Sequence, residues 1–141
     1  MLSKTLEVST AFLLHKGKAL LLRRSSKVGT YRNKWASVSG YVERFETPLE
    51  TALKEIYEET GLTLKEIKLL KQSQIEAEDK DLETKWKINT FLFESKTDKI
   101  RINWENKEAK WVRPADIGKF DTVPKLKEAL DALINSGKEK S

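Results

Sequence analysis

The sequence predicts an α+β fold in which a mixed β-sheet packs against one central helix and one helix near the C-terminal end. Several segments are rich in Val, Ile, Phe and Trp and are separated by polar or Gly-containing turns, as expected for strands. Residues 47–61 carry both a helix start signal and a helix stop signal. Residues 122–137 place Leu side chains at helical spacing. These elements fit an α+β fold or a three-layer α/β/α arrangement.

The first elements are predicted to form a β-hairpin. Residues 6–25 contain two apolar runs around a polar turn, in which Gly17 supplies the turn conformation. Residues 26–34 are polar and are expected to form a loop. A short extended segment over residues 35–40 then leads to the central helix.

The central helix has clear boundaries in the sequence. Thr47 is placed as the N-cap, Pro48 as the first helical residue and Glu50 as the second half of a capping box. Gly61 follows the last helical residue, where a left-handed conformation commonly ends a helix. We therefore expect a helix between these two signals.

The remaining elements are strands followed by a helix. Residues 63–78 and 84–95 are predicted strands joined by an acidic turn, and residues 107–117 are a further strand that runs into a short helical turn. The C-terminal helix over residues 122–137 is amphipathic and is expected to stop at Gly137. The lone His15 is expected to be a surface residue of the hairpin turn.

Length and composition limit the class of protein. A chain of 141 residues fits one domain, which we assign to residues 1–137, with a frayed tail over residues 138–141. There is no cysteine, which excludes a disulfide scaffold and a thiolate-bound metal. No apolar run approaches the roughly 18 residues of a membrane span, and the first residues lack the order of a signal peptide. We therefore expect a cytoplasmic protein without a membrane partner.

The charge pattern favours small anionic partners. The formal net charge is +5, and positive and negative residues are interspersed rather than grouped in blocks. A field of this size does not single out nucleic acid, so nucleic acid is not expected as a partner. The sequence leaves a homodimer open.

Three carboxylates of the central helix share one side of its surface. At 100° per residue, and with Glu55 set at zero, Glu58 falls at about −60° and Glu59 at about +40°. Like charges at this spacing repel by roughly 0.2–0.5 kcal/mol per pair in an isolated helix. The adjoining arc is apolar and is formed by Leu49, Ala52, Leu53 and Ile56. The helix can therefore bury its apolar side while it presents the acids next to it.

Two interpretations of these acids are open from the helix alone. Glu50, Lys54 and Glu58 have the spacing of a salt-bridge ladder on a solvated helix face, although such a ladder leaves Glu55 and Glu59 unexplained. The other interpretation is a metal site. A cluster of carboxylate oxygens without Cys or a nearby His suits Mg²⁺ or Mn²⁺ and does not suit zinc.

Residues 40–62 resemble the Nudix box, whose pattern is G-x5-E-x7-R-E-U-x-E-E-x-G-U with U a bulky aliphatic residue. Every defined position matches except one, because Lys54 stands where the family has Arg. The flanking hairpin, the Trp-Val-Arg-Pro segment at residues 111–114 and the final helix also resemble the Nudix α/β/α sandwich. Family members often have Gly at the positions of Ser39 and Phe45, so the loop at the box entrance departs from the usual pattern.

The resemblance implies a Mg²⁺-dependent hydrolase that cleaves a diphosphate linked to another group, with Mn²⁺ as the alternative cation. The implied metal ligands are Glu55, Glu58, Glu59 and the backbone carbonyl of Gly40. Metal ions would reverse the local field so that an acidic face can accept a diphosphate. Glu55 is also placed to act as the general base, although a base outside the box remains an alternative.

Glu46 and Lys54 are expected to support the site rather than to bind metal. Lys carries a point charge on a flexible stem where Arg would make planar, bidentate contacts. We expect Lys54 to keep the charge compensation, towards Glu46 or Glu58, with less positional control.

Candidates outside the box rest on weaker signals. The loop before it offers cations for substrate phosphates, with Arg24, Arg32 and Lys34 selected from a group that also contains Arg23 and Lys27. The Trp residues available to stack on a base, or to pack in the core, are Trp86, Trp104 and Trp111. The candidates for an extra metal ligand or base are Glu76, Glu78, Glu105 and Glu108.

The substrate is limited only to a class. Some Nudix subfamilies carry a marker Pro or Tyr some sixteen to eighteen residues past the box, where this chain has Glu78, Asp79 and Lys80. We therefore expect a nucleotide-type substrate, a nucleoside diphosphate or triphosphate derivative of open identity. The alternative function is a non-catalytic Nudix-fold module that binds a nucleotide or an RNA end. Such modules usually lack one or more box acids, and all of them are present here.

Overall fold

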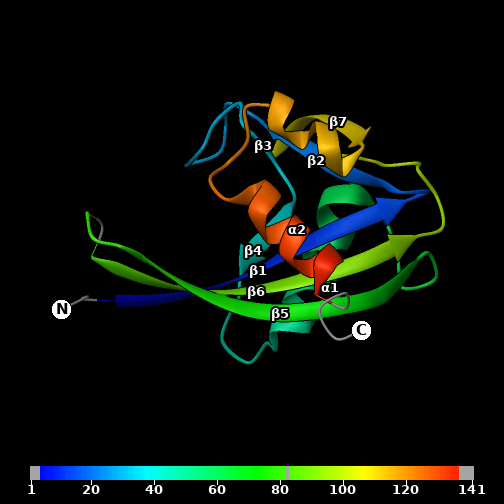
Figure 1. The fold of residues 1–141 in the computed structure, drawn as a ribbon. Helices are drawn as coiled ribbons and strands as arrows, with labels where there is room; N and C mark the ends of the chain where they lie inside the picture. Colours follow the sequence, from blue (N-terminus) through cyan, green and yellow to red (C-terminus); the bar gives the residue numbers. More distant parts are fainter. Residues whose placement is uncertain (1–3, 82, 137–141) are drawn as a thin grey trace.

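A mixed seven-stranded β-sheet forms the centre of the molecule, with one helix on each face (Figure 1). The structure, a computed structural model, describes residues 4–81 and 83–136. Its elements are β1 (Lys4–His15), β2 (Lys18–Arg24), β3 (Trp35–Ala36), β4 (Val38–Tyr41), α1 (Pro48–Thr60), β5 (Ile67–Asp79), β6 (Thr84–Ser95), β7 (Asn106–Val112), the 3₁₀ helix η1 (Pro114–Lys119) and α2 (Leu126–Asn135). The α+β class and the three-layer α/β/α arrangement predicted from the sequence are confirmed.

Strand β1 organises the sheet. It runs parallel to β6 on one side, and on the other side it pairs first with β4 and then, near its end, with β2. Because β2 leaves β1 to pair with β3 and β7, β4 occupies the place beside the middle of β1. Gly40 lies opposite Ser9 in this register. The sheet therefore holds the first residue of the predicted box in a fixed position.

Two apolar cores lie on opposite faces of the sheet because strand side chains alternate between faces. On β6, Phe91 and Phe93 point to the core under α1, and Leu92 points to the core under α2. Helix α1 contributes Ala52 and Ile56 to its core. Helix α2 contributes Leu126, Leu130 and Leu133 to the other. The apolar stripe predicted on each helix is the side that it buries.

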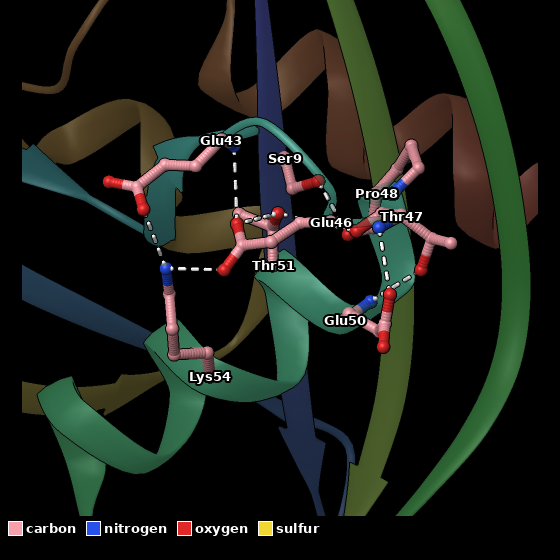
Figure 2. Close-up of polar contacts among 8 residues, drawn as sticks. All are labelled: Ser9, Glu43, Glu46, Thr47, Pro48, Glu50, Thr51 and Lys54. Atoms are coloured by element: carbon pink, nitrogen blue, oxygen red, sulfur yellow. Dashed lines mark hydrogen bonds and ion pairs between the residues drawn. The ribbon is translucent and has the colours of Figure 1, made fainter.

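The predicted ends of α1 are confirmed. Thr47 Oγ1 accepts a hydrogen bond from the Glu50 backbone N–H, and the Glu50 carboxylate accepts one from the Thr47 N–H, at 3.1 and 2.9 Å. Gly61 follows the helix with φ = 79°, in the left-handed region. The Ser9 hydroxyl donates to the Pro48 carbonyl at 2.7 Å, which ties the start of the helix to β1 (Figure 2). These contacts fix both the axial position and the rotation of α1.

Two expectations from the sequence concern His15 and the C-terminal end of the chain. The prediction for His15 is wrong, because this residue ends β1, is half-buried and lies with Nδ1 2.8 Å from the Ser95 carbonyl oxygen. The predicted helix stop at Gly137 and the frayed tail over residues 138–141 lie outside the described residues.

Neither of the α-helices that the structure describes is long and apolar enough to cross a lipid bilayer.

We predict that Thr47→Ala lowers the free energy of unfolding by about 1 kcal/mol, because it leaves the Glu50 backbone N–H without its cap. The matched control is Thr47→Ser, which keeps the hydroxyl. Urea denaturation followed by circular dichroism measures both variants. Equal stability of the Ala and Ser variants would show that the cap does not stabilise α1.

Candidate active site

The carboxylates of α1 differ in their surroundings. Glu58 is exposed, Glu55 is half-buried, and Glu59 is only 4% exposed. Glu55 and Glu58 line a cavity of about 680 Å³, together with Gly40 from β4 and Glu105 from the loop before β7. The helix therefore presents Glu55 and Glu58 to the cavity, whereas the buried Glu59 is not among its lining residues.

Among the described residues, one side chain donates a hydrogen bond to the Glu59 carboxylate, and this bond satisfies only one of its two oxygens. Its Oε1 accepts from Asn106 Nδ2 at 3.3 Å. Its Oε2 is buried and receives no hydrogen bond from the residues that the structure describes. Burial of an ionised carboxylate without a partner is strongly unfavourable. A positive group at this oxygen would remove the penalty.

The pKa values of the two inner acids reflect this burial. Burial raises the pKa of Glu59 to about 9, and the nearby charges of Glu105 and Glu55 act in the same direction. Burial also raises the pKa of Glu55 to about 7, with the charges of Glu58 and Glu105 as further causes. The interaction between the two carboxyl groups raises the pKa of Glu59 and lowers that of Glu55. Without a cation, the pair therefore tends to hold a proton.

Gly40 lies directly against Glu55. A Cβ atom at position 40 would come within 2.6 Å of Glu55 Cγ and Cδ. A side chain here would push the Glu55 carboxylate out of its place, so the absence of a side chain is what allows the close approach. Strand β4 and helix α1 are therefore in contact where Gly40 meets Glu55.

A brace at the box entrance holds the loop that precedes α1 (Figure 2). Lys54 Nζ donates to Glu46 Oε2 at 2.7 Å and lies 3.7 Å from Glu43 Oε2. Glu46 Oε1 accepts from the Thr51 hydroxyl at 2.8 Å, and these hydrogen bonds hold the pKa of Glu46 below its usual value. The alternative ladder through Glu50, Lys54 and Glu58 is not what forms, because Lys54 turns towards the loop.

The donor atoms fit a hard divalent cation. They are carboxylate oxygens, and one of them, Glu59 Oε2, is buried without a hydrogen-bond partner among the described residues. The backbone of Gly40 lies directly against the Glu55 side chain. In residues 4–81 and 83–136, no group of three or more His, Cys, Asp or Glu side chains is gathered closely enough to be a ready-made metal cage. The groups that could hold such a cation are the carboxylates of Glu55, Glu58 and Glu59 and the Gly40 carbonyl.

The NUDIX domain family model matches residues 4–133, which is nearly all of the chain. The chain belongs to the Nudix family.

Solved structures that share its fold include the following two. An Ap4A hydrolase of C. elegans, in a binary complex, has a TM-score of 0.77 at 17% identity and covers 96% of this chain and 99% of its own. The MutT protein of Methanosarcina mazei Go1 has a TM-score of 0.76 at 24% identity and covers 98% and 99%.

A relative with higher local identity is the m7GpppN-mRNA hydrolase NUDT17 of Danio rerio. It is 42% identical over 65 residues, which are 45% of this chain and 22% of the relative. The chain therefore matches about a fifth of the length of that relative.

The entrance of the Nudix box contains one strained residue. Phe45 has φ = 72°, in the left-handed region that favours Gly, and its side chain is 95% exposed. Its ring is held by the guanidinium group of Arg44, which lies 5.3 Å from the ring centroid. The Gly that family members often have at this position would adopt the same backbone without this strain.

The cations selected from the sequence lie at the end of β2 and in the loop that follows it. Arg24 lines the cavity, and its Nε donates to the Thr30 carbonyl at 2.9 Å. Arg32 donates to the Val28 carbonyl and is not among the cavity residues. Lys34 is also outside the cavity lining and pairs with Asp121 at 2.9 Å. The structure thus brings only Arg24 of these three to the Nudix box acids.

The acidic and Trp candidates from the sequence also fall into two groups, those that line the cavity and those that do not. Of the four acids, Glu78 and Glu105 line the cavity, whereas Glu76 pairs with Lys85 and Glu108 pairs with Arg23. Of the three Trp residues, Trp86 and Trp104 line the cavity. Trp111 instead packs on His15, and its Nε1 donates to the Asp98 carbonyl.

Asn106 is the site residue that sequence reasoning missed. It begins β7, is buried and holds the Glu59 carboxylate, although 47 positions separate the two residues along the chain. Only its place directly after the acidic candidate Glu105 could have drawn attention to it. An isolated Asn before a strand carries no spacing signal.

We predict that the metal-free protein loses stability as the pH rises from about 5 towards 9. The unfolded chain releases the Glu59 proton near the ordinary glutamate pKa of 4.5, whereas the folded chain keeps it up to a pKa of about 9, so the folded state binds more protons in this window. Thermal denaturation in EDTA at several pH values measures the effect. Glu59→Gln should flatten the dependence, and the exposed Glu58→Gln should retain it.

Thermal denaturation at the same pH values with Mg²⁺ in place of EDTA tests whether a cation stabilises the ionised Glu59. Because a cation replaces the proton, Mg²⁺ should raise the melting temperature more at pH 9 than at pH 6. A Glu59→Gln variant that keeps the pH dependence of the parent would show that the buried carboxylate is not its source.

Proposed function

We propose that the protein is a Mg²⁺-dependent pyrophosphohydrolase that cleaves a diphosphate linkage in a nucleotide-type substrate, with Mn²⁺ as the alternative cation. The observation that carries this proposal is the buried Glu59 oxygen, which has no hydrogen-bond partner among the residues that the structure describes, on a helix turn shared with two further carboxylates. Two of the similar proteins are named as hydrolases, one of m7GpppN-mRNA and one of Ap4A, which supports hydrolysis as the reaction class.

The Nudix box residues have separate tasks in this proposal. Glu58, Glu59 and the Gly40 carbonyl hold the cation, with Glu55 at the edge of the same group. When bound, the cation supplies positive charge that neutralises phosphate oxygens and makes the attacking water more acidic. Glu55 accepts the proton of that water.

Other residues bind the substrate or hold the site in shape. Arg24 lies in the cavity wall and can place its guanidinium group on a phosphate, where planar bidentate contacts are favourable. Glu46 and Lys54 keep the loop before α1 folded against the helix. Asn106 holds Glu59 Oε1, which leaves Oε2 as the oxygen that a cation would bind.

We predict turnover when the protein meets a panel of nucleoside triphosphates, nucleotide sugars and dinucleotides with Mg²⁺. Phosphate, pyrophosphate or a nucleoside monophosphate should appear, and EDTA should abolish their release. Chromatography of the products identifies the bond that is cleaved. Absence of turnover with Mg²⁺ and with Mn²⁺, at neutral and alkaline pH, would contradict the proposal. Tight nucleotide binding that EDTA does not change would instead favour a binding module.

Substitutions separate the roles on α1. Glu59→Gln keeps the size of the side chain but removes the charge that holds Mg²⁺, so turnover and metal affinity should both fall. Glu55→Gln should lower turnover by about 10²–10⁴-fold, the usual contribution of a general base, while metal affinity largely persists. Lys54→Arg should be neutral or mildly favourable, because it offers Glu46 a bidentate partner.

Calorimetric titration of Mg²⁺ and steady-state kinetics measure the two effects. Glu128→Gln, the same change on α2 and outside the cavity lining, is the matched control and should behave as the parent. If Glu59→Gln stays within a few-fold of the parent in turnover, this helix face is not the metal site.

A further inference from the structure

Strand β5 is the longest of the strands that lie at an edge of the sheet. It has 13 residues and pairs with β6 on one side, whereas the edge strands β3, β4 and β7 have two, four and seven residues. In Figure 1 its second half runs with β6 to the left of both helices. An edge strand presents a row of unpaired backbone N–H and C=O groups, to which another strand can add. Within the described part of the chain, β5 offers the longest row of this kind.

The second half of β5 lacks most of the features that protect an edge. All residues from 72 to 78 are exposed. The β-bulge of the strand comes earlier, between Leu69 and Lys71, and residues 72–79 contain no Lys, Pro or Gly. Bulges, Lys and Pro are among the usual means by which soluble proteins prevent pairing at an edge. Ile75 adds an apolar side chain that is 44% exposed, so this segment is open to a pairing strand.

Charged side chains are divided between the two ends of β5. Lys68 and Lys71 lie in its first part, and Glu76, Glu78 and Asp79 lie at its end. Opposite charges directly across two strands stabilise their pairing, and like charges destabilise it. A parallel copy of β5 in register would place like charges together, whereas an antiparallel copy brings the acidic end against the basic end. The strand is therefore complementary to itself in the antiparallel orientation.

A two-fold axis perpendicular to the sheet limits the possible registers. Directly opposite residues of an antiparallel pair point to the same face, and residues on one face are two apart along a strand, so one residue must face its own copy on the axis. An axis at Glu76 or Ala77 brings acids together, because Glu76 then meets Glu76 or Glu78 of the second copy. An axis nearer the start of the strand brings an acid against Leu70 at the bulge.

The register with Ile75 on the axis avoids every pair of acids. The exposed Ile75 side chains then contact each other, which removes apolar surface from water. The paired segment runs from residue 71 to residue 79 in each copy and starts directly after the bulge. The polar pairs across the axis are Glu76 with Gln74, Glu78 with Gln72 and Asp79 with Lys71. Each acid thus faces an amide or an ammonium group.

We propose that β5 pairs with β5 of a second copy of this chain, antiparallel and with Ile75 on the two-fold axis, so that the two sheets form one continuous sheet. Such an interface is isologous, because the same strand serves both copies. The inference does not depend on the proposed function. It does affect the cavity, because Ile75 and Asp79 are among its lining residues. Lys71 of the second copy would lie beside Asp79 and add a cation to the cavity wall.

The first test uses the absence of cysteine from the chain. Ile75→Cys places a single thiol on the axis, where the two Cα atoms are about 4.5–5.5 Å apart, within the range of a disulfide. Ser73→Cys lies on the same face, but its Cα is roughly 14 Å from its own copy in this register. Under mild oxidation, Ile75→Cys should form a crosslinked dimer on a non-reducing gel, and Ser73→Cys alone should not. A mixture of Ser73→Cys and Ala77→Cys should crosslink, because these two positions face each other.

Charge substitutions at Gln72 test the register without a crosslink. This residue faces Glu78 of the second copy twice in each dimer, so Gln72→Lys should tighten the dimer and Gln72→Glu should weaken it, each by roughly 2–30-fold. Sedimentation equilibrium measures the dissociation constant against the single-chain mass of 16.3 kDa. The gain from Gln72→Lys should shrink as NaCl screens the charges.

Ser26→Lys and Ser26→Glu are the matched controls, because Ser26 is exposed in the loop after β2, and β1 and β6 separate β2 from β5 in the sheet. Both should dimerise as the parent does. Thermal denaturation of each variant confirms that it is folded.

A single-chain mass of the unsubstituted protein at every concentration tested would overturn the proposal. It would also be overturned if Ser73→Cys crosslinked alone as readily as Ile75→Cys. The same conclusion would follow if the Gln72 substitutions changed the dissociation constant no more than those at Ser26, because the copies would then pair through another register or surface. Absence of hydrolysis would contradict the proposed function and leave this interface unaffected.

Discussion

The burial of Glu59 is the constraint around which the candidate site is built. The same turn of α1 buries Ile56 and Thr60 in the core, so the helix cannot rotate to release the Glu59 carboxylate into water. Asn106 satisfies one of its oxygens, and no residue in the described part of the chain donates to the other. A charge held in this way requires either a proton or a cation. The fold thus gives up stability at this position, which is common where a site binds a charged ligand.

Several independent contacts hold α1 in the orientation that this burial demands. The capping box at Thr47 starts the helix at a defined residue, and the Ser9 hydroxyl binds that start to β1. Gly61 ends it in a left-handed conformation. The Lys54–Glu46 pair keeps the preceding loop folded back on the helix. The acids therefore stand on a rigid element, as precise metal coordination requires, and do not depend on loop order.

The cavity beside the acids is assembled from segments that are distant in the sequence. The separation of β2 from β1 leaves room for β4, and this topology places Gly40 at the edge of the cavity. The long strands β5 and β6 add an apolar floor, and the loops around Trp104 close the other side. In our proposal, the box residues carry out the hydrolysis, and Arg24 in the cavity wall contacts the substrate.

The sequence by itself determined the elements and the acidic face of α1, because these follow from local signals. Strand alternation, the Thr47 cap, Gly61 and the helical spacing of Glu55 and Glu59 are all short-range patterns, and the structure contains the elements that they predict. Tertiary structure decided which candidates meet. It buried Glu59 rather than Glu58, turned Lys54 to Glu46, and separated the cavity residues from those engaged elsewhere, such as Lys34, Glu108 and Trp111. The reason is physical: burial and charge pairing are set by strand register and by packing between segments that are far apart along the chain, and no spacing within one segment records them.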